Sequence, residues 1–132
     1  EAQVVLPRYA GDLAQLLAEA AAGEIRSEPM WDERAAVTVV LASEGYPLSP
    51  RTGDPISGLD EAGSLPGVTV YSAGLGPGRT TAGGRVLNVT ALGADLPDAR
   101  RRAYEAVSKI HWPGMHYRHD IAEAAAASEV RV

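Results

Sequence analysis

The chain lacks cysteine and phenylalanine, and Lys109 is its single lysine beside eleven arginines. Without cysteine it has no disulfide framework, no thiolate zinc site and no cysteine nucleophile. Its 12 basic residues are fewer than its 17 acidic ones, the net charge is -5, and the longest basic run is residues 100–102. A nucleic-acid partner is therefore not expected, because surfaces that bind nucleic acid are strongly basic.

Long apolar runs are also missing. A membrane-spanning helix needs about 20 consecutive apolar residues, and no stretch of the chain approaches that length. No charged leader precedes an apolar signal core, so we expect no membrane partner and a cytoplasmic location. The 132 residues are enough for one domain with a packed core. Because the chain begins at Glu1, without methionine and just before an apolar run at residues 4–6, we expect it to be part of a longer protein.

Two helices are indicated by apolar residues that recur at helical spacing. The first is expected over residues 11–22, where the Asp12 carboxylate can cap the first turn. The second is expected to begin after Asp95, a good N-cap residue, and to end near residue 110. An alanine-rich segment at 121–129 is expected to be helical or frayed.

Three segments rich in β-branched and apolar residues are expected to be strands: 35–42, 68–73 and 85–92. The first has no regular polar alternation, which predicts that both of its faces are covered. A long segment at 44–58, rich in glycine and proline, is expected to be an ordered loop with tight turns. This order of elements predicts an α+β domain built on a small antiparallel sheet.

Classical catalytic and metal-binding motifs are not evident. His111, His116 and His119 lie near Asp120, but an extended segment places His116 and His119 on opposite faces, so hydrogen-bonding histidines are favoured over a zinc site. Turn capping by Asp54 is favoured over a Mg²⁺ site. No serine lies in a Gly-x-Ser-x-Gly elbow, so a hydrolase triad is not supported. We therefore expect no metal ligand in the chain.

Two glycine-rich segments are candidates for ligand contact. Residues 74–78 lack the lysine and the following helix of a phosphate loop, which favours a hairpin. Residues 81–85 (TAGGR) are a stronger candidate, because glycines let the backbone approach a ligand and Arg85 can present a planar fork to a phosphate. The alternative is a glycine-permitted bulge with an exposed arginine.

Many short segments together resemble the phosphoribosylamine-glycine ligase family, also called the glycinamide ribonucleotide synthetases. The resemblance covers nearly the whole chain, with the segments in the family's order and spacing. They are EAQVVLPR (1–8), WD (31–32), AAV (35–37), VLAS (40–43), GYP (45–47), GDPI (53–56), GL (58–59), TAGGRVL (81–87), VTALG (89–93), AY (103–104), GMHYR (114–118) and DI (120–121).

The resemblance implies an ATP-grasp enzyme of de novo purine synthesis, an ATP-dependent carbon-nitrogen ligase. Members join glycine to 5-phosphoribosylamine through a glycyl phosphate, give glycinamide ribonucleotide, and cleave ATP to ADP and phosphate. The whole enzyme is expected to use ATP with Mg²⁺ or Mn²⁺. In the family the metal ligands lie just before the position of Glu1, so the resemblance implies no catalytic residue and no bound cofactor in this chain, which alone is expected to be inactive.

The resemblance also implies a division of the chain into two parts. Residues 1–30 would be the tail end of the ATP-grasp domain, a strand, a helix and a linker. Residues 31–132 would be the C-terminal domain, a small mainly antiparallel sheet or half-barrel with flanking helices. The N-terminal and ATP-grasp domains of the same parent chain are the expected partners. The alternative is a free-standing ligand-binding or interaction module derived from this domain.

The resemblance implies that Arg85, with the backbone of Gly83 and Gly84, contacts the phosphoribosyl substrate. Further candidates, equally consistent with structural or domain-interface roles, are Tyr46, Asp54, His116 and Arg118. Two places depart from the family pattern. Residues 71–75 lack an expected histidine and threonine, and Ala122 stands where the family has glycine.

Overall fold

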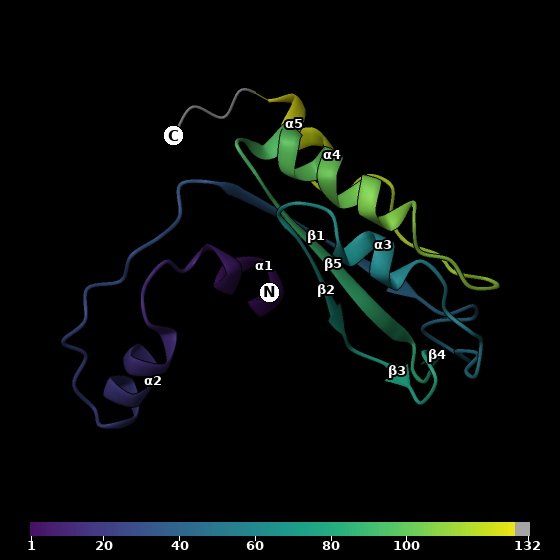
Figure 1. The fold of residues 1–132 in the computed structure, drawn as a ribbon, viewed down its shortest axis with the longest axis horizontal. Coiled ribbons are helices and arrows are strands. Elements are labelled where there is room, and N and C mark those ends of the chain that lie inside the picture. The colour runs from purple at the N-terminus through teal and green to yellow at the C-terminus, as the bar shows by residue number, and fades with distance from the viewer. Residues whose placement is uncertain (129–132) are drawn as a thin grey trace.

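The structure, a computed structural model, describes residues 1–128, so Glu129 of the predicted tail lies outside the described residues. Helices and strands alternate irregularly along the chain (Figure 1). In order they are α1 (Ala2–Val5), the 3₁₀ helix η1 (Leu6–Arg8), α2 (Leu13–Ala21), β1 (Ala35–Ala42), α3 (Leu59–Gly63), β2 (Val68–Ser72), β3 (Leu75–Gly76), β4 (Thr80–Thr81), β5 (Arg85–Gly93), α4 (Leu96–Val107) and α5 (Glu123–Ala127).

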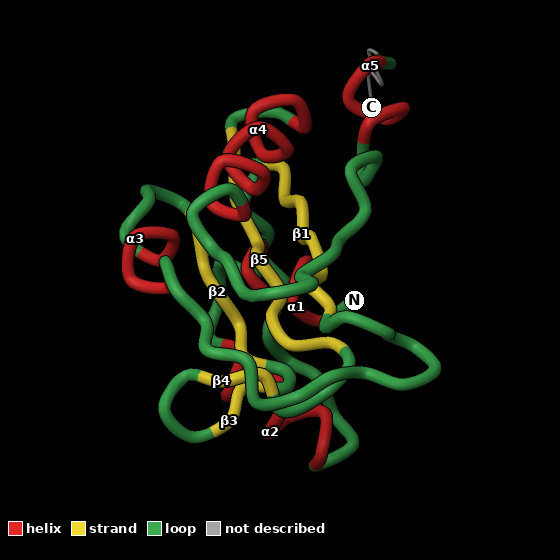
Figure 2. The backbone as a smooth tube through the Cα atoms, turned by 90° about the vertical axis from the view of Figure 1, so that its right-hand side faces the viewer, coloured by secondary structure: helices red, strands yellow, loops and turns green. Residues whose placement is uncertain are grey.

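The main sheet has three strands in the order β1-β5-β2, and both of its pairings are antiparallel. The short strands β3 and β4 form a separate two-stranded hairpin at the end where β5 begins (Figure 2). The predicted α+β class with a small antiparallel sheet is confirmed. Because β5 is the central strand, its backbone is hydrogen-bonded to a neighbouring strand on each side.

Helix α4 covers one face of the sheet (Figure 1). Its side chains Ala99, Ala103, Ala106 and Val107 are buried and contribute to one apolar cluster with the sheet. The small alanine side chains allow the helix to approach the strands closely. Asp95 caps the helix as predicted, since its carboxylate accepts a hydrogen bond of 2.8 Å from the Asp98 backbone N–H.

Helix α1 lies against the other face of the sheet and meets a pair of threonines there (Figure 1). The hydroxyls of Thr38 and Thr90 are 2.6 Å apart, and both reach the Gln3 carbonyl oxygen. This face is covered less completely than the α4 face: Val40 is 37% exposed. The prediction that strand 35–42 is covered on both faces is therefore wrong, because α1 is only one turn long and leaves the end of the face open.

Residues 1–30 differ in part from the expected strand, helix and linker. The helix is present as α2, and Asp12 caps it by accepting from the Gln15 N–H. The expected strand is absent, because residues 2–8 form α1 and η1 instead and lie across the sheet face rather than along a strand edge that could pair with them. No residue of α2 is buried, and Figure 1 shows α2 apart from the sheet. The domain division at residue 30 stays a prediction.

The C-terminal part follows the prediction closely, although α4 ends three residues earlier than expected. Ile110 and Trp112 still enter the core, 2% and 0% exposed. The expected extended segment at 115–120 makes one isolated bridge, between His116 and Ala42. Within residues 1–128, no helix has the length and apolar character needed to cross a membrane.

Candidate functional site

A cavity of about 470 Å³ opens where β5 begins, on the sheet face that carries α1. It is lined by Gln3, Tyr46, Pro47, Pro50, Ala73, Gly84, Arg85 and Asn88. The lining therefore combines one cation, two carboxamides, one aromatic ring and two prolines. Three of the predicted site residues, Tyr46, Gly84 and Arg85, lie together in this wall, and Gly83 is the next residue along the chain.

A β-bulge directs Arg85 into the cavity. Leu41 of β1 pairs with Leu87, but the next residue, Ala42, pairs with Arg85, so Val86 is an extra residue in β5. In a regular strand, residues three apart point to opposite faces of the sheet. One extra residue reverses this relation, and Arg85 and Asn88 consequently line the same cavity.

Ser43 holds the peptides of Gly83 and Gly84 in place. Its hydroxyl donates to the Gly83 carbonyl oxygen at 2.9 Å, and its backbone N–H donates to the Gly84 carbonyl oxygen at 2.9 Å. Ser43 is fully buried. In a trans peptide the N–H points away from the preceding carbonyl, so the Gly84 N–H points away from Ser43. No carbonyl of residues 1–128 accepts it, which leaves this N–H available to a ligand.

Tyr46 lies directly over Gly84. A Cβ atom added at Gly84 would come within 3.0 Å of the Tyr46 Cε2 atom and closer still to Cδ2. Only a glycine lets the ring approach the backbone in this way. The ring of Tyr46, 39% exposed, therefore forms one wall of the cavity beside the glycine peptide.

Arg85 differs from the other arginines of residues 1–128 in having neither an ion pair nor a hydrogen bond to the protein. Eight of them form ion pairs with acidic side chains: Arg26, Arg34, Arg51, Arg79, Arg100, Arg101, Arg102 and Arg118. The ninth, Arg8, donates to the Asp32 carbonyl oxygen. Arg85 is exposed and lines the cavity, and no carboxylate of residues 1–128 stands in that lining, which suits the guanidinium to an anionic ligand.

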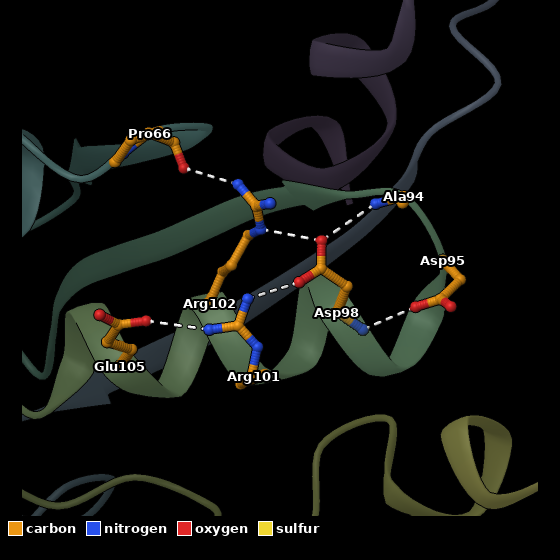
Figure 3. A network of polar contacts seen from close by, with 7 residues as sticks. All are labelled: Pro66, Ala94, Asp95, Asp98, Arg101, Arg102 and Glu105. Atoms are coloured by element: carbon orange, nitrogen blue, oxygen red, sulfur yellow. Dashed lines mark hydrogen bonds and ion pairs between the residues drawn. The ribbon is translucent and has the colours of Figure 1, made fainter.

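The first turns of α4 show the contrasting arrangement (Figure 3). The Asp98 carboxylate accepts hydrogen bonds from Arg101 at 2.6 Å and from Arg102 at 2.9 Å. The hydrogen bonds from Arg101 and from the Ala94 backbone N–H hold the pKa of Asp98 below its ordinary value. These arginines are used in a network of the protein itself and are not available to a ligand.

The other predicted candidates have protein partners or lie outside the cavity lining. The Asp54 carboxylate accepts a hydrogen bond from Arg51 at 2.9 Å. Arg118 makes a two-pronged ion pair with Asp120. His116 is exposed, and its backbone forms the bridge to Ala42. None of the three lines the cavity, and their roles in substrate binding stay predictions.

The described residues do not fit a bound cation. Within residues 1–128 no three histidine or acidic side chains gather as a metal site would require. Glu44 and Asp54, in the loop that carries the cavity wall, both pair with Arg51.

Asn88 and Ser43 are the two residues of this region that the sequence analysis missed. An asparagine within a strand of apolar and β-branched residues is a visible signal, because a buried carboxamide is rare without a partner. Ser43 gives no such signal, since its role depends on bonds to residues 40 and 41 positions away.

Sequence comparison with known proteins identifies the domain. Residues 36–124 match the family described as "Phosphoribosylglycinamide synthetase, C domain". Phosphoribosylamine-glycine ligases of Streptomyces coelicolor and Leifsonia xyli are 53% and 52% identical, over 97% and 95% of this chain and 32% of each relative. A chloroplastic phosphoribosylamine-glycine ligase of Arabidopsis thaliana is 48% identical, over 92% of this chain and 24% of its own length.

A solved structure agrees with the sequence comparison. The crystal structure of phosphoribosylamine-glycine ligase from Thermotoga maritima superposes with a TM-score of 0.69 at 34% identity, over 83% of this chain and 27% of that protein. The chain thus spans a third or less of the length of these relatives. The fold and these likenesses define the C domain of this synthetase family. The chain belongs to the phosphoribosylglycinamide synthetase family, as the sequence resemblance predicts.

Proposed function

We propose that this chain is the C-terminal part of an ATP-dependent carbon-nitrogen ligase that joins glycine to 5-phosphoribosylamine in purine biosynthesis. Glycinamide ribonucleotide, ADP and phosphate are the products. Residues 1–30 belong to the end of the ATP-grasp domain and residues 31–132 to the C-terminal domain. The family match and the names of the relatives support this assignment.

In this proposal the cavity at the start of β5 binds the phosphate of the phosphoribosyl substrate. The observation that carries it is the Arg85 guanidinium, which lines the cavity without any protein partner. The guanidinium donates to two phosphate oxygens, and the Gly84 N–H donates to the phosphate from the adjacent peptide. Gly83 contributes through its carbonyl, which Ser43 holds, so that the peptide is fixed before the ligand binds.

The remaining parts of the reaction belong to the rest of the parent enzyme. ATP, with Mg²⁺ or Mn²⁺, activates the glycine carboxylate there, and the N-terminal and ATP-grasp domains are the partners of this chain. The chain's own residues bind and orient the phosphoribosyl substrate, which places its amine for attack. We also propose a cytoplasmic location, although the Arabidopsis relative is named as chloroplastic.

Replacement of Arg85 in the full ligase tests the site. Arg85→Ala removes a charged hydrogen bond, which is worth about 1.5–3 kcal/mol, so kcat/KM for 5-phosphoribosylamine should fall about 10- to 150-fold. The apparent affinities for ATP and glycine should change little. Arg26→Ala is the matched control, because Arg26 is exposed and pairs only with Glu24. An unchanged kcat/KM for the phosphoribosyl substrate would exclude Arg85 from its binding site.

A further inference from the structure

We propose that the Asn88 carboxamide forms a hydrogen bond with a ribose hydroxyl of the phosphorylated substrate. This bond makes the cavity selective for a sugar phosphate over a simple phosphate ester. This inference rests on the proposed function, because it assumes that Arg85 binds the phosphate. It adds a specificity-determining residue on the central strand.

The burial of Asn88 is the first observation. Asn88 is 7% exposed, yet it lines the cavity. Its cross-strand neighbours are Val40 on β1 and Tyr71 on β2. No side-chain hydrogen bond within residues 1–128 involves its carboxamide, which is open to the cavity and is not among the sealed side-chain groups without a partner, Arg8 Nε and Trp112 Nε1. A polar group that faces a cavity without a protein partner bonds to the water or the ligand in that cavity.

The next polar pair on the same sheet face shows the contrast. Thr90, two residues further along β5, bonds to Thr38 at 2.6 Å and to the Gln3 carbonyl oxygen at 2.9 Å. The protein therefore satisfies the polar groups of this face where α1 covers them. Asn88 lies at the cavity, whose lining includes Gln3 of α1, and its carboxamide is left for whatever occupies the cavity.

The chemistry of the lining indicates the ligand class. A carboxamide offers both a donor and an acceptor, which is the pattern that a sugar hydroxyl requires. The bulge at Val86 places Arg85 and Asn88 in the same wall. One ligand can then bind the guanidinium through its phosphate and the carboxamide through a ring hydroxyl, with the Tyr46 ring beside the sugar.

The test uses the full ligase that contains this chain and two probes, ribose 5-phosphate and propyl phosphate. The second probe has the phosphate but no ring hydroxyl. Asn88→Leu, which keeps the branched shape and the number of heavy atoms and removes the carboxamide, should weaken ribose 5-phosphate binding about 3- to 12-fold in calorimetric titration. Propyl phosphate binding should stay within about 2-fold, because no hydrogen bond to it is lost. Thr69→Val is the control, since Thr69 is exposed on β2 and lies outside this cavity.

A second measurement does not depend on a variant that folds. In the ¹⁵N-asparagine-labelled enzyme, the Asn88 side-chain amide signals should shift with ribose 5-phosphate and not with propyl phosphate. Equal shifts with both probes, or equal losses of affinity for both in Asn88→Leu, would overturn the proposal and show a structural role. If Arg85→Ala leaves propyl phosphate binding unchanged, the phosphate assignment fails instead, and the two failures are thereby distinguished.

Discussion

Gly84→Ala is the substitution for which the structure gives the most specific expectation. The added Cβ would come within 3.0 Å of Tyr46 Cε2 and closer to Cδ2. Ordinary carbon–carbon contact lies at about 3.5–4.0 Å, so the ring has to move away by about an ångström. The backbone itself tolerates alanine, because the φ angle of Gly84 is not positive. The strain therefore comes from Tyr46 alone.

The size of the effect follows from the exposure of the ring. Overpacking at an interior position costs about 1–3 kcal/mol, and a ring that is 39% exposed can yield toward solvent, so we expect the lower half of that range. For a chain of 132 residues, about 1–2 kcal/mol lowers the thermal midpoint by roughly 3–10 °C. Thermal unfolding followed by circular dichroism measures this shift.

Gly83→Ala is the matched control, since its added Cβ meets Gly74 Cα at 3.6 Å and the Arg85 carbonyl oxygen at 3.8 Å. These are ordinary contacts, and the reduced freedom of the unfolded chain should leave this variant as stable as the parent or about 0.4–1 kcal/mol more stable. In a Tyr46→Ala background the cost of Gly84→Ala should largely vanish. Equal midpoints for the two glycine variants, or a full cost that persists without Tyr46, would refute the reasoning.

Two further predictions concern the residues that hold the site and the acid stability of the chain. Ser43→Ala removes the buried hydrogen bond to the Gly83 carbonyl oxygen and should lower the free energy of unfolding in urea by about 1 kcal/mol; an unchanged value would show that Ser43 does not hold this segment. The pKa values of Asp98 and Asp32 are lowered in the folded chain, that of Asp32 to about 2, chiefly by hydrogen bonds from Arg101 and Arg34 respectively. The stability that these two ionised carboxylates give the folded chain is therefore complete above about pH 5 and is lost as the pH falls toward 2. The thermal midpoint should fall over that range, and Asp98→Asn should make this fall with pH less steep. A midpoint that stays constant down to pH 2 would contradict this expectation.

The elements with strong local signals were predictable from the sequence. Helix α4 has an N-cap at Asp95 and a stripe of alanines at helical spacing, and both features act within the segment itself. The segment at residues 2–8 was not predictable in this way. A strand needs an edge to pair with, and the apolar residues Val4 and Val5 do not specify one. In the structure the segment turns into helices whose Gln3 carbonyl is held by two threonines far along the chain.

Only the part of the candidate site that has a local signal in the sequence was predictable from it. The Gly-Gly-Arg segment indicated Arg85, and a bulge with an exposed arginine stood as the competing interpretation. The structure shows the bulge and the exposed arginine, and the contact of Arg85 with a phosphate stays a prediction. Because Val86 is the extra residue between two pairings of β1 with β5, the bulge is what places Arg85 on the cavity side. The pairing of β5 with Leu41 and Ala42 of β1 determines which residue forms the bulge. The sequence of β5 alone does not specify that pairing.

The same dependence explains why Asn88 escaped notice. Regular alternation puts Asn88 on the face opposite Arg85, where it would be a lone polar residue of a buried strand. Once the bulge reverses that relation, the free guanidinium and the carboxamide without a protein partner lie in one wall. Asn88 lies where the central strand is paired on both sides, whereas Arg85 is exposed at the start of that strand and its long side chain has no protein partner within residues 1–128. The ligand therefore sets the final geometry, because a phosphate bound at Arg85 determines which of the ligand's other groups can reach Asn88.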